Sequence, residues 1–165
     1  MPVDTDRIEK SVRRLRKVLK KAPRRPTPDQ VHRLRIHARR IEATVAALGL
    51  SSRANEKRLL RDLARVRRRA GKVRDMDVLT GHTCGLHVDQ DQDCLVQLLE
   101  HLGAQRYDLA GELHASMTDY GPRLRRRLKR ASSRIRKMIR DDADASNGDA
   151  TADHGDGGCS DQNLR

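Results

Sequence analysis

The sequence predicts an all-α protein, an antiparallel helical bundle of about four to five helices followed by a disordered acidic C-terminal tail. Apolar residues recur every three or four positions over long stretches, which is the spacing of amphipathic helices. Aromatic residues are nearly absent, with two Tyr and neither Phe nor Trp. The core must therefore be built from aliphatic side chains, a composition that suits helices better than a sheet.

The first two helices are expected over residues 5–21 and about 28–48, separated by three prolines at 23, 26 and 28. Thr27 is a suitable N-cap, Pro28 suits the first helical position, and Gln30 completes a capping box. Gly49 ends the second helix. The apolar stripes of the two helices are Ile8, Val12, Leu15 and Leu19, then Val31, Leu34, Ala38, Ile41, Val45 and Leu48.

Three further helices are expected over about 54–80, 90–116 and 120–140, with a loop over 81–88. Gly71 lies inside the third helix, where glycine costs about 1 kcal/mol relative to alanine. It therefore marks either close packing or a bend. The apolar stripe of the helix over 54–80 is Leu59, Leu63, Val66, Ala70 and Val73. That of the helix over 90–116 is Leu95, Leu98, Leu99, Leu102, Leu109 and Leu113, and that of the helix over 120–140 is Leu124, Leu128, Ile135 and Ile139.

Charge is distributed unevenly along the chain, whose formal net charge is +13. Residues 1–140 hold 35 Lys or Arg against 16 Asp or Glu, whereas residues 141–165 hold seven Asp and one Arg. We therefore expect a basic helical domain over 1–140 and a disordered Asp/Gly-rich tail over 141–165. The domain favours a polyanionic partner, and Arg suits phosphate oxygens through its planar fork. One hypothesis is that the tail competes with such a partner.

The sequence also indicates a compartment. Cys84, Cys94 and Cys159 form no CxxC motif and no even framework, which is typical of reduced thiols in a cytoplasmic protein. No apolar stretch follows the N-terminal charges, so no signal peptide is expected. No run approaches the roughly 20 apolar residues of a transmembrane helix. We expect a cytoplasmic location.

The segment VHRLRIHARR, residues 31–40, is the most informative part of the chain. At helical spacing, His32, Arg35 and Arg39 fall within about 60° of one another and away from the apolar stripe. Cationic groups stacked in this way repel one another and destabilise a helix. A bound anion would remove that repulsion, so this face is a candidate anion-binding site.

The third helix carries a second basic face. Six cations fall within about 100° of arc, namely Arg58, Arg61, Arg65, Arg68, Arg69 and Lys72. At its end, Asp75 and Asp77 are placed to orient nearby guanidinium groups through charge-assisted hydrogen bonds. Arg106 lies within a leucine stripe, where an unpaired Arg is costly. It is expected to face a polar centre or to pair with one of these two Asp residues.

These two segments together resemble the CHAD domain, the conserved histidine α-helical domain. In that family a helix carries a His, an Arg three residues later and a basic pair at seven and eight, matched here by His32, Arg35, Arg39 and Arg40. A later helix carries an Arg-Asp-x-Asp-Val signature, matched by Arg74, Asp75, Asp77 and Val78. The resemblance covers roughly residues 5–140.

The resemblance implies a non-catalytic module without a cofactor, whose basic residues line a cavity, bind inorganic polyphosphate and associate with polyphosphate granules. Asp75 and Asp77 are expected to be structural. Arg65 and Arg106 are assigned by helical face rather than by motif. The expected polyphosphate-binding residues are His32, Arg35, Arg39, Arg40, Arg65, Arg68, Lys72, Arg74 and Arg106.

The chain departs from the family in two ways. Glu42 stands where the family usually has another Arg, which weakens one expected contact. The family also typically has two related bundles, each with its own His motif, whereas this chain has one such motif and resembles a half-length member. One hypothesis is that two chains pair as a homodimer to rebuild the two-bundle cavity.

Three alternative functions remain open. Sequence-nonspecific nucleic-acid binding fits the charge, but the chain lacks aromatic platforms for single strands and any recognisable helix-turn-helix or zinc finger. A catalytic role would need acidic metal ligands in a basic cavity, and only Asp75 and Asp77 qualify. A zinc site matches no common spacing, and a calcium loop would have Cys94 where Gly is required. The residues concerned are His82, Cys84, His87 and Cys94 for zinc, and Asp89, Asp91, Asp93 and Glu100 for calcium.

Overall fold

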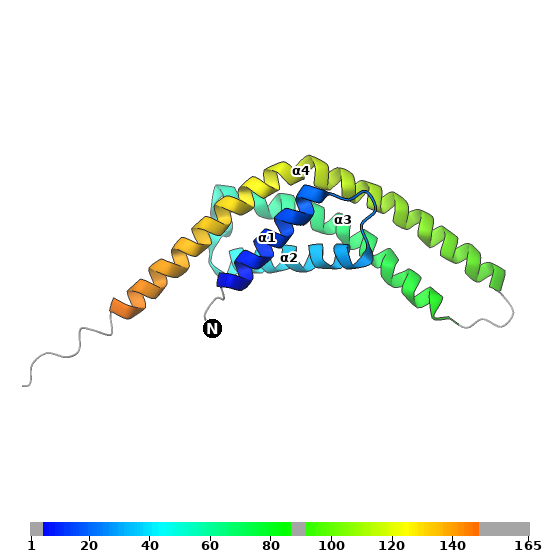
Figure 1. Ribbon diagram of the computed structural model, residues 1–165, viewed down its shortest axis with the longest axis horizontal. Coiled ribbons are helices and arrows are strands. Elements are labelled where there is room, and N and C mark those ends of the chain that lie inside the picture. The colour runs from blue at the N-terminus through cyan, green and yellow to red at the C-terminus, as the bar shows by residue number, and fades with distance from the viewer. Residues whose placement is uncertain (1–4, 87–91, 149–165) are drawn as a thin grey trace, which may run out of the picture.

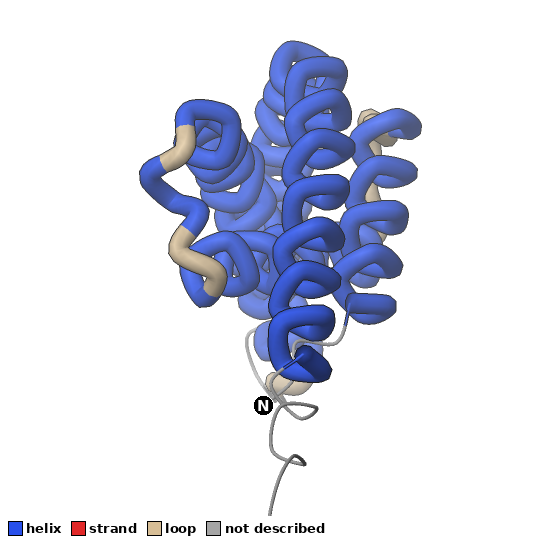
Figure 2. The backbone as a smooth tube through the Cα atoms, turned by 90° about the vertical axis from the view of Figure 1, so that its left-hand side faces the viewer, coloured by secondary structure: helices blue, strands red, loops and turns tan. Residues whose placement is uncertain are grey.

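The computed structural model describes residues 5–86 and 92–148, and within them it contains helices and no strand (Figures 1 and 2). Each helix packs against its neighbours in the order α1, α2, α3, α4 and back to α1, whereas the diagonal pairs α1–α3 and α2–α4 have no Cα atoms within 8 Å of each other. The predicted all-α bundle is confirmed. The elements are α1 (Thr5–Lys21), α2 (Pro28–Ala47), the short 3-10 helix η1 (Leu50–Ser52), α3 (Ala54–Cys84) and α4 (Gln92–Gly148).

The start and end of α2 follow local rules that the sequence predicts. The Thr27 hydroxyl accepts a hydrogen bond from the Gln30 N–H at 3.3 Å, and the Gln30 side chain accepts one from the Thr27 N–H at 3.0 Å. Pro28 occupies the first turn, where its missing N–H costs nothing. Gly49 adopts a left-handed conformation with φ of 62° just after the helix, as expected of a helix-ending glycine.

The predicted fourth and fifth helices are wrong as separate elements, because residues 92–148 form one helix. Pro122 lies inside it, where proline removes one hydrogen bond and clashes with the preceding turn. The helix continues because buried side chains anchor it on both sides of the proline, Leu113 and Met117 before it and Leu124 and Leu128 after it. Figure 1 shows α4 as an arch over the bundle, the form expected of a helix with an internal proline.

Two predicted boundaries also differ. Helix α3 runs to Cys84, so the first residues of the predicted 81–88 loop are helical. Helix α4 runs to Gly148, so the backbone of residues 142–148 is helical, in contrast to the predicted disorder. The rest of the predicted tail, residues 149–165, lies outside the described part of the chain.

The core consists of the predicted stripes of α1, α2, α3 and the central part of α4. Beyond the ends of α1 and α2, the C-terminal end of α3 and the N-terminal end of α4 continue as a two-helix arm, residues 76–86 and 92–104 (Figure 1). There the stripe of α4 is only partly buried, since Leu98 is 42% exposed although Leu102 is buried. No third helix of the described chain covers the arm. Its exposed apolar side chains are Val78, Leu79, Leu86, Val96 and Leu98.

Ion pairs join α3 to α4 along most of their shared length. Arg134 Nη1 lies 2.6 Å from Glu56 Oε2, and Arg106 Nε lies 2.6 Å from Asp77 Oδ1. Two more pairs, Arg127 with Asp62 and Arg69 with Glu112, lie between them. Many acidic groups of the basic domain are therefore neutralised inside the fold, which leaves other cations free to meet a partner.

Candidate polyanion-binding surface

A hollow of about 400 Å³ lies between α3 and α4, and it gathers three of the cations that the sequence predicts to bind an anion. Arg65, Arg68 and Lys72 recur on one side of α3, and α4 supplies the opposite wall. We call this hollow the α3–α4 groove. It is lined by Arg65, Arg68, Arg69, Lys72, Ser116 and Tyr120.

Tyr120 organises one end of the groove. Its hydroxyl oxygen accepts a hydrogen bond from Arg65 Nη1 at 3.3 Å, and its ring centroid lies 5.5 Å from the Arg65 guanidinium carbon. The Arg123 guanidinium carbon lies 5.4 Å from the same ring. Such cation–π contacts hold guanidinium groups without neutralising them. The ring therefore positions two cations that keep their full charge for an anion.

The α2 face that carries the predicted His motif adjoins α3 at Gly71. A Cβ atom at Gly71 would lie 2.6 Å from Nη1 of Arg35, so the missing side chain makes room for this guanidinium. Of the two alternatives predicted for Gly71, close packing or a bend, the structure shows close packing. Arg35 thus lies against the turn of α3 that carries Arg68 and Lys72, while His32 and Arg39 are exposed on the same face of α2.

Comparison with family models identifies the family of the chain. The CHAD domain family model matches residues 6–154, which is most of the chain. The chain belongs to the CHAD domain family. No curated protein and no solved structure matches it.

Other residues of the CHAD motifs face elsewhere. Arg40 is exposed and raises the positive potential at His37, which also lies near Arg14 of α1, so Arg40 belongs to the α1 side of α2. Arg74 is half-buried on α3. Glu42, the departure from the family pattern, pairs with Arg67 at 2.9 Å and so ties α2 to α3.

Arg106 has an intramolecular role in this CHAD domain. Its Nε donates to Asp77 Oδ1 at 2.6 Å, and its Nη2 donates to the Pro26 carbonyl oxygen at 2.9 Å. The expected pairing of Arg106 with an Asp of the Arg-Asp-x-Asp signature is therefore confirmed. The Asp77 side chain is buried, whereas Asp75 is exposed.

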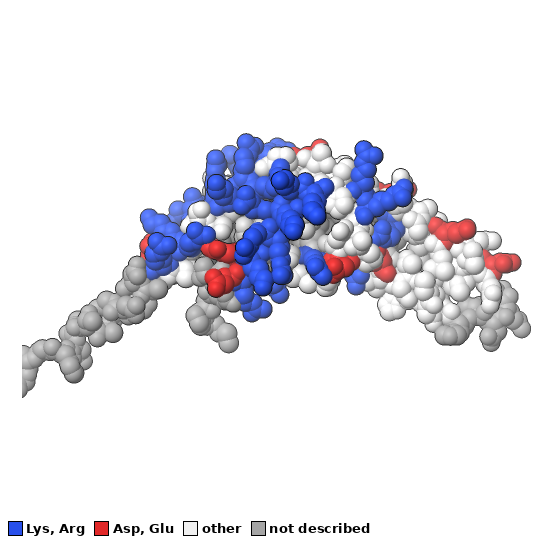
Figure 3. All heavy atoms as spheres, viewed as in Figure 1, with Lys and Arg blue, Asp and Glu red and all other residues white. Residues whose placement is uncertain are grey.

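A basic face on α1 lies outside both CHAD motifs and was not predicted as a binding surface. Figure 3 shows Lys and Arg side chains crowded over α1 and the neighbouring part of α4. Because α1 and α3 lie diagonally across the bundle, with no Cα atoms within 8 Å of each other, this face is separate from the α3–α4 groove. The available signal was the density of cations outside the α1 stripe. They are Arg7, Lys10, Arg13, Arg14, Arg16, Lys17, Lys20 and Lys21.

Most cations of this CHAD domain therefore cover outer faces, whereas its interior is mainly apolar and holds a few buried polar side chains. His37 is one of these buried polar side chains. Its side chain is 5% exposed, and its Nδ1 has no hydrogen-bond partner among the described residues. Burial lowers the pKa of His37 below its ordinary value, and the positive charges of Arg14, Arg40 and Arg33 lower it further.

The described residues hold no group of three or more His, Cys, Asp or Glu side chains that could bind a metal ion. Of the predicted zinc candidates, Cys84 and Cys94 are exposed free thiols on α3 and α4. His87, Asp89 and Asp91 lie outside the described residues. None of the helices in the described ranges has the length and apolar character needed to cross a membrane.

Proposed function

We propose that this CHAD domain binds inorganic polyphosphate in the α3–α4 groove and on the adjoining face of α2, without catalysing a reaction. The observation that carries the proposal is the convergence of four cations in one groove. Family membership supports it, since the CHAD family is associated with polyphosphate binding in general. Association with polyphosphate granules is part of the same proposal.

The charge state of the groove supports a long, uniformly anionic ligand. Arg68 and Lys72 have no ion-pair partner within the described ranges, and Arg65 contacts a neutral phenol. Only Arg69 is paired, with Glu112. Polyphosphate, which repeats a negative charge along its chain, would relieve the mutual repulsion of these cations. Arg35, which lies against Gly71, would extend the cationic binding surface from α3 to α2.

Binding of this kind releases counterions, so affinity should fall steeply as salt rises. Nucleic acid obeys the same rule, and salt dependence alone does not separate the two ligands. The decisive measurement is a competition titration at near-physiological salt, in which labelled long-chain polyphosphate is challenged with duplex DNA, RNA and free phosphate. We expect polyphosphate to be displaced poorly by all three.

Two double variants test whether polyphosphate binds in the α3–α4 groove or is attracted equally to any positive surface of the protein. Removing Arg68 and Lys72 as a double alanine variant should weaken polyphosphate binding at least tenfold, about 1.4 kcal/mol. Arg13→Ala with Lys17→Ala removes the same charge from the exposed face of α1 and serves as the matched control, with a much smaller loss. Equal losses in both variants, together with equal competition by DNA, would show a general basic binder.

Gly71→Ala tests the contribution of α2 without changing any charge. The new Cβ would displace the tip of the flexible Arg35 side chain, a shift that costs little folding energy. The helix itself should gain up to about 1 kcal/mol. We therefore expect a folded protein of equal or higher stability whose polyphosphate affinity falls toward that of Arg35→Ala with Arg39→Ala. Unchanged affinity in both variants would remove α2 from the binding surface.

A further inference from the structure

The linker between α1 and α2 is held at both ends by side chains of α4. His114 Nδ1 lies 2.7 Å from the Ala22 carbonyl oxygen, and Arg106 Nη2 donates to the Pro26 carbonyl oxygen at 2.9 Å. Ala22 has φ of 35°, in the left-handed region that residues with a Cβ rarely adopt. The linker conformation is thus fixed by tertiary contacts rather than by local preference.

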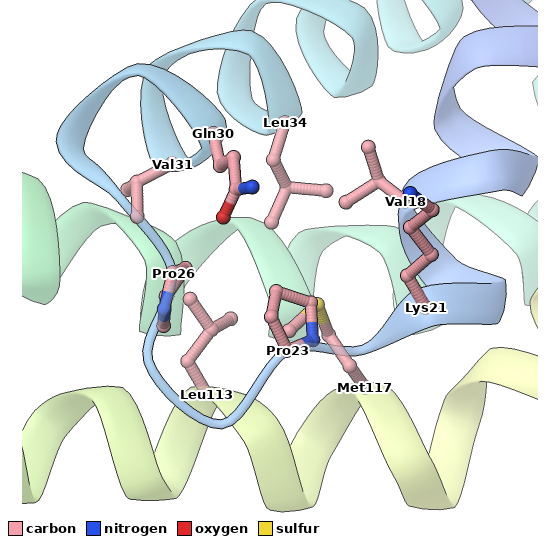
Figure 4. Close-up of a pocket in the computed structure, with 9 residues that line it drawn as sticks. All are labelled: Val18, Lys21, Pro23, Pro26, Gln30, Val31, Leu34, Leu113 and Met117. Carbon is pink, nitrogen blue, oxygen red and sulfur yellow. The ribbon is translucent and has the colours of Figure 1, made fainter.

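The two prolines of the linker face inward. Pro23 and Pro26 line an apolar cavity of about 90 Å³ together with Leu113 and Met117 of α4 (Figure 4). The residues between them, Arg24 and Arg25, are exposed. Two adjacent guanidinium groups are therefore presented outward from a segment whose backbone is anchored on both sides.

These arginines form one wall of a second hollow, of about 410 Å³, that shares no residue with the α3–α4 groove. The Arg25 guanidinium carbon lies 5.1 Å from the centroid of the Tyr107 ring, which remains 58% exposed. We call this hollow the linker pocket. It is lined by Arg24, Arg25, Tyr107, Asp108, Gly111 and His114.

His114 adds a defined hydrogen-bonding group. A carbonyl oxygen can only accept, so the Nδ1 that contacts Ala22 must carry the proton. In this tautomer Nε2 can accept a hydrogen bond from a ligand. Gly111 leaves the pocket open beside it, because a Cβ at this position would meet no atom within 4 Å.

The mixture of groups points to a ligand other than a bare phosphate chain. Arg24 and Arg25 suit phosphate oxygens, and the Tyr107 ring with its stacked guanidinium suits a planar base. Asp108 would repel a uniform polyanion, but it can accept hydrogen bonds from a sugar hydroxyl or an exocyclic amine. A nucleotide combines phosphate, planar ring and hydrogen-bond donors, and a volume of this size is typical of small-molecule sites.

We propose that the linker pocket binds a nucleoside diphosphate, with its phosphates on Arg24 and Arg25 and its base on Tyr107. This site is independent of the proposed polyphosphate groove. His114 of α4 contacts the linker, whereas Glu112 and Tyr120 contact Arg69 and Arg65 of α3, so the two sites occupy different flanks of α4.

Calorimetric titration of the full chain with ADP, pyrophosphate and adenosine tests the proposal. We expect ADP to bind at least tenfold more tightly than either pyrophosphate or adenosine. Tyr107→Ala should abolish the preference for ADP over pyrophosphate, whereas Tyr107→Phe should retain it. Equal affinity for ADP and pyrophosphate, unchanged by Tyr107→Ala, would overturn base recognition.

Two more variants locate the site. Gly111→Leu fills the open space with a residue that favours helix more than glycine, so loss of ADP binding by a protein with unchanged helical content would reflect a blocked pocket. Arg68→Ala with Lys72→Ala should weaken polyphosphate binding and leave ADP binding unchanged. Loss of ADP binding in that groove variant, with Gly111→Leu unaffected, would assign the nucleotide to the groove and overturn the proposal.

Discussion

His37 is the buried side chain whose environment makes the clearest prediction at the scale of one residue. Its imidazole is buried among positive charges, and its pKa is lowered first by burial and then by Arg14, Arg40 and Arg33. In the unfolded chain the ring takes up a proton near pH 6.5. The folded protein resists that proton, so the unfolded state binds more protons as the pH falls below about 6.5. The free energy of unfolding should therefore decrease from pH 7.5 toward pH 5.5.

Chemical denaturation at these two pH values checks the expectation. His37→Gln should flatten the loss of stability, because the variant no longer carries the titrating ring. His82→Gln is the matched control, since it removes an exposed histidine near the end of α3. Parallel curves for the parent and His37→Gln would contradict the assignment.

The residues of the candidate groove were only partly predictable. The helical arc of α3 identified Arg65, Arg68 and Lys72, because their relation depends on helix geometry alone. Ser116 and Tyr120 lie far along the chain and meet them only through the packing of α4 on α3. The site roles of all these residues remain predictions.

At the scale of the element, the α3–α4 pairing depends on buried charge. Glu56 is 0% exposed and is paired with Arg134 at 2.6 Å, with a further hydrogen bond from Asn55 Nδ2 at 3.2 Å. Arg134→Ala would leave this carboxylate buried without its counter-ion, which typically costs about 3–5 kcal/mol. Arg130→Ala, an exposed position on the same helix, should change stability by less than about 0.5 kcal/mol.

Urea denaturation of both variants measures the difference. A loss confined to Arg134→Ala would show that the ion pair fastens the C-terminal half of α4 to α3. Equal and small losses would mean that water reaches Glu56 when Arg134 is absent. The pair was not predicted from the sequence, because neither residue interrupts an apolar stripe in a way that signals burial.

Element boundaries show which sequence rules are strong. The capping box at Thr27 and the helix-ending Gly49 act locally, and both were predicted. Pro122 also acts locally, yet the fused α4 overrides it because Met117 and Leu124 are buried on either side of the proline. The free energy gained by burying several large side chains exceeds the roughly 3 kcal/mol cost of one internal proline.

At the scale of the whole molecule, charge and apolar surface are segregated. Residues 75–105 contain six Asp or Glu and no Lys or Arg, whereas 36 Lys or Arg lie in the rest of the chain. Figure 3 shows the contrast between the blue body and the arm, where blue side chains are absent from the visible face. A polyanion should therefore be attracted to the body and repelled from the arm.

The two-helix arm exposes an apolar surface that can pair with a second copy of the chain. Its exposed apolar side chains include Leu79 and Leu98, which no other described segment covers. We expect a second copy to cover them, because identical patches can pair about a two-fold axis while the basic bodies stay apart. The paired arms carry like negative charge, so added salt should strengthen association through screening. Salt should weaken the proposed polyphosphate binding, so the two processes should respond in opposite directions.

Sedimentation velocity across a range of salt concentrations tests this pairing. The parent should shift toward dimer as salt rises, and Leu79→Gln with Leu98→Gln should remain monomeric with unchanged helical content. Arg126→Gln with Lys137→Gln alters two exposed residues at the other end of α4 and should leave the dimer intact. A parent that stays monomeric at every salt concentration, yet binds polyphosphate fully, would show that one chain provides the whole binding surface and that pairing has no part in it.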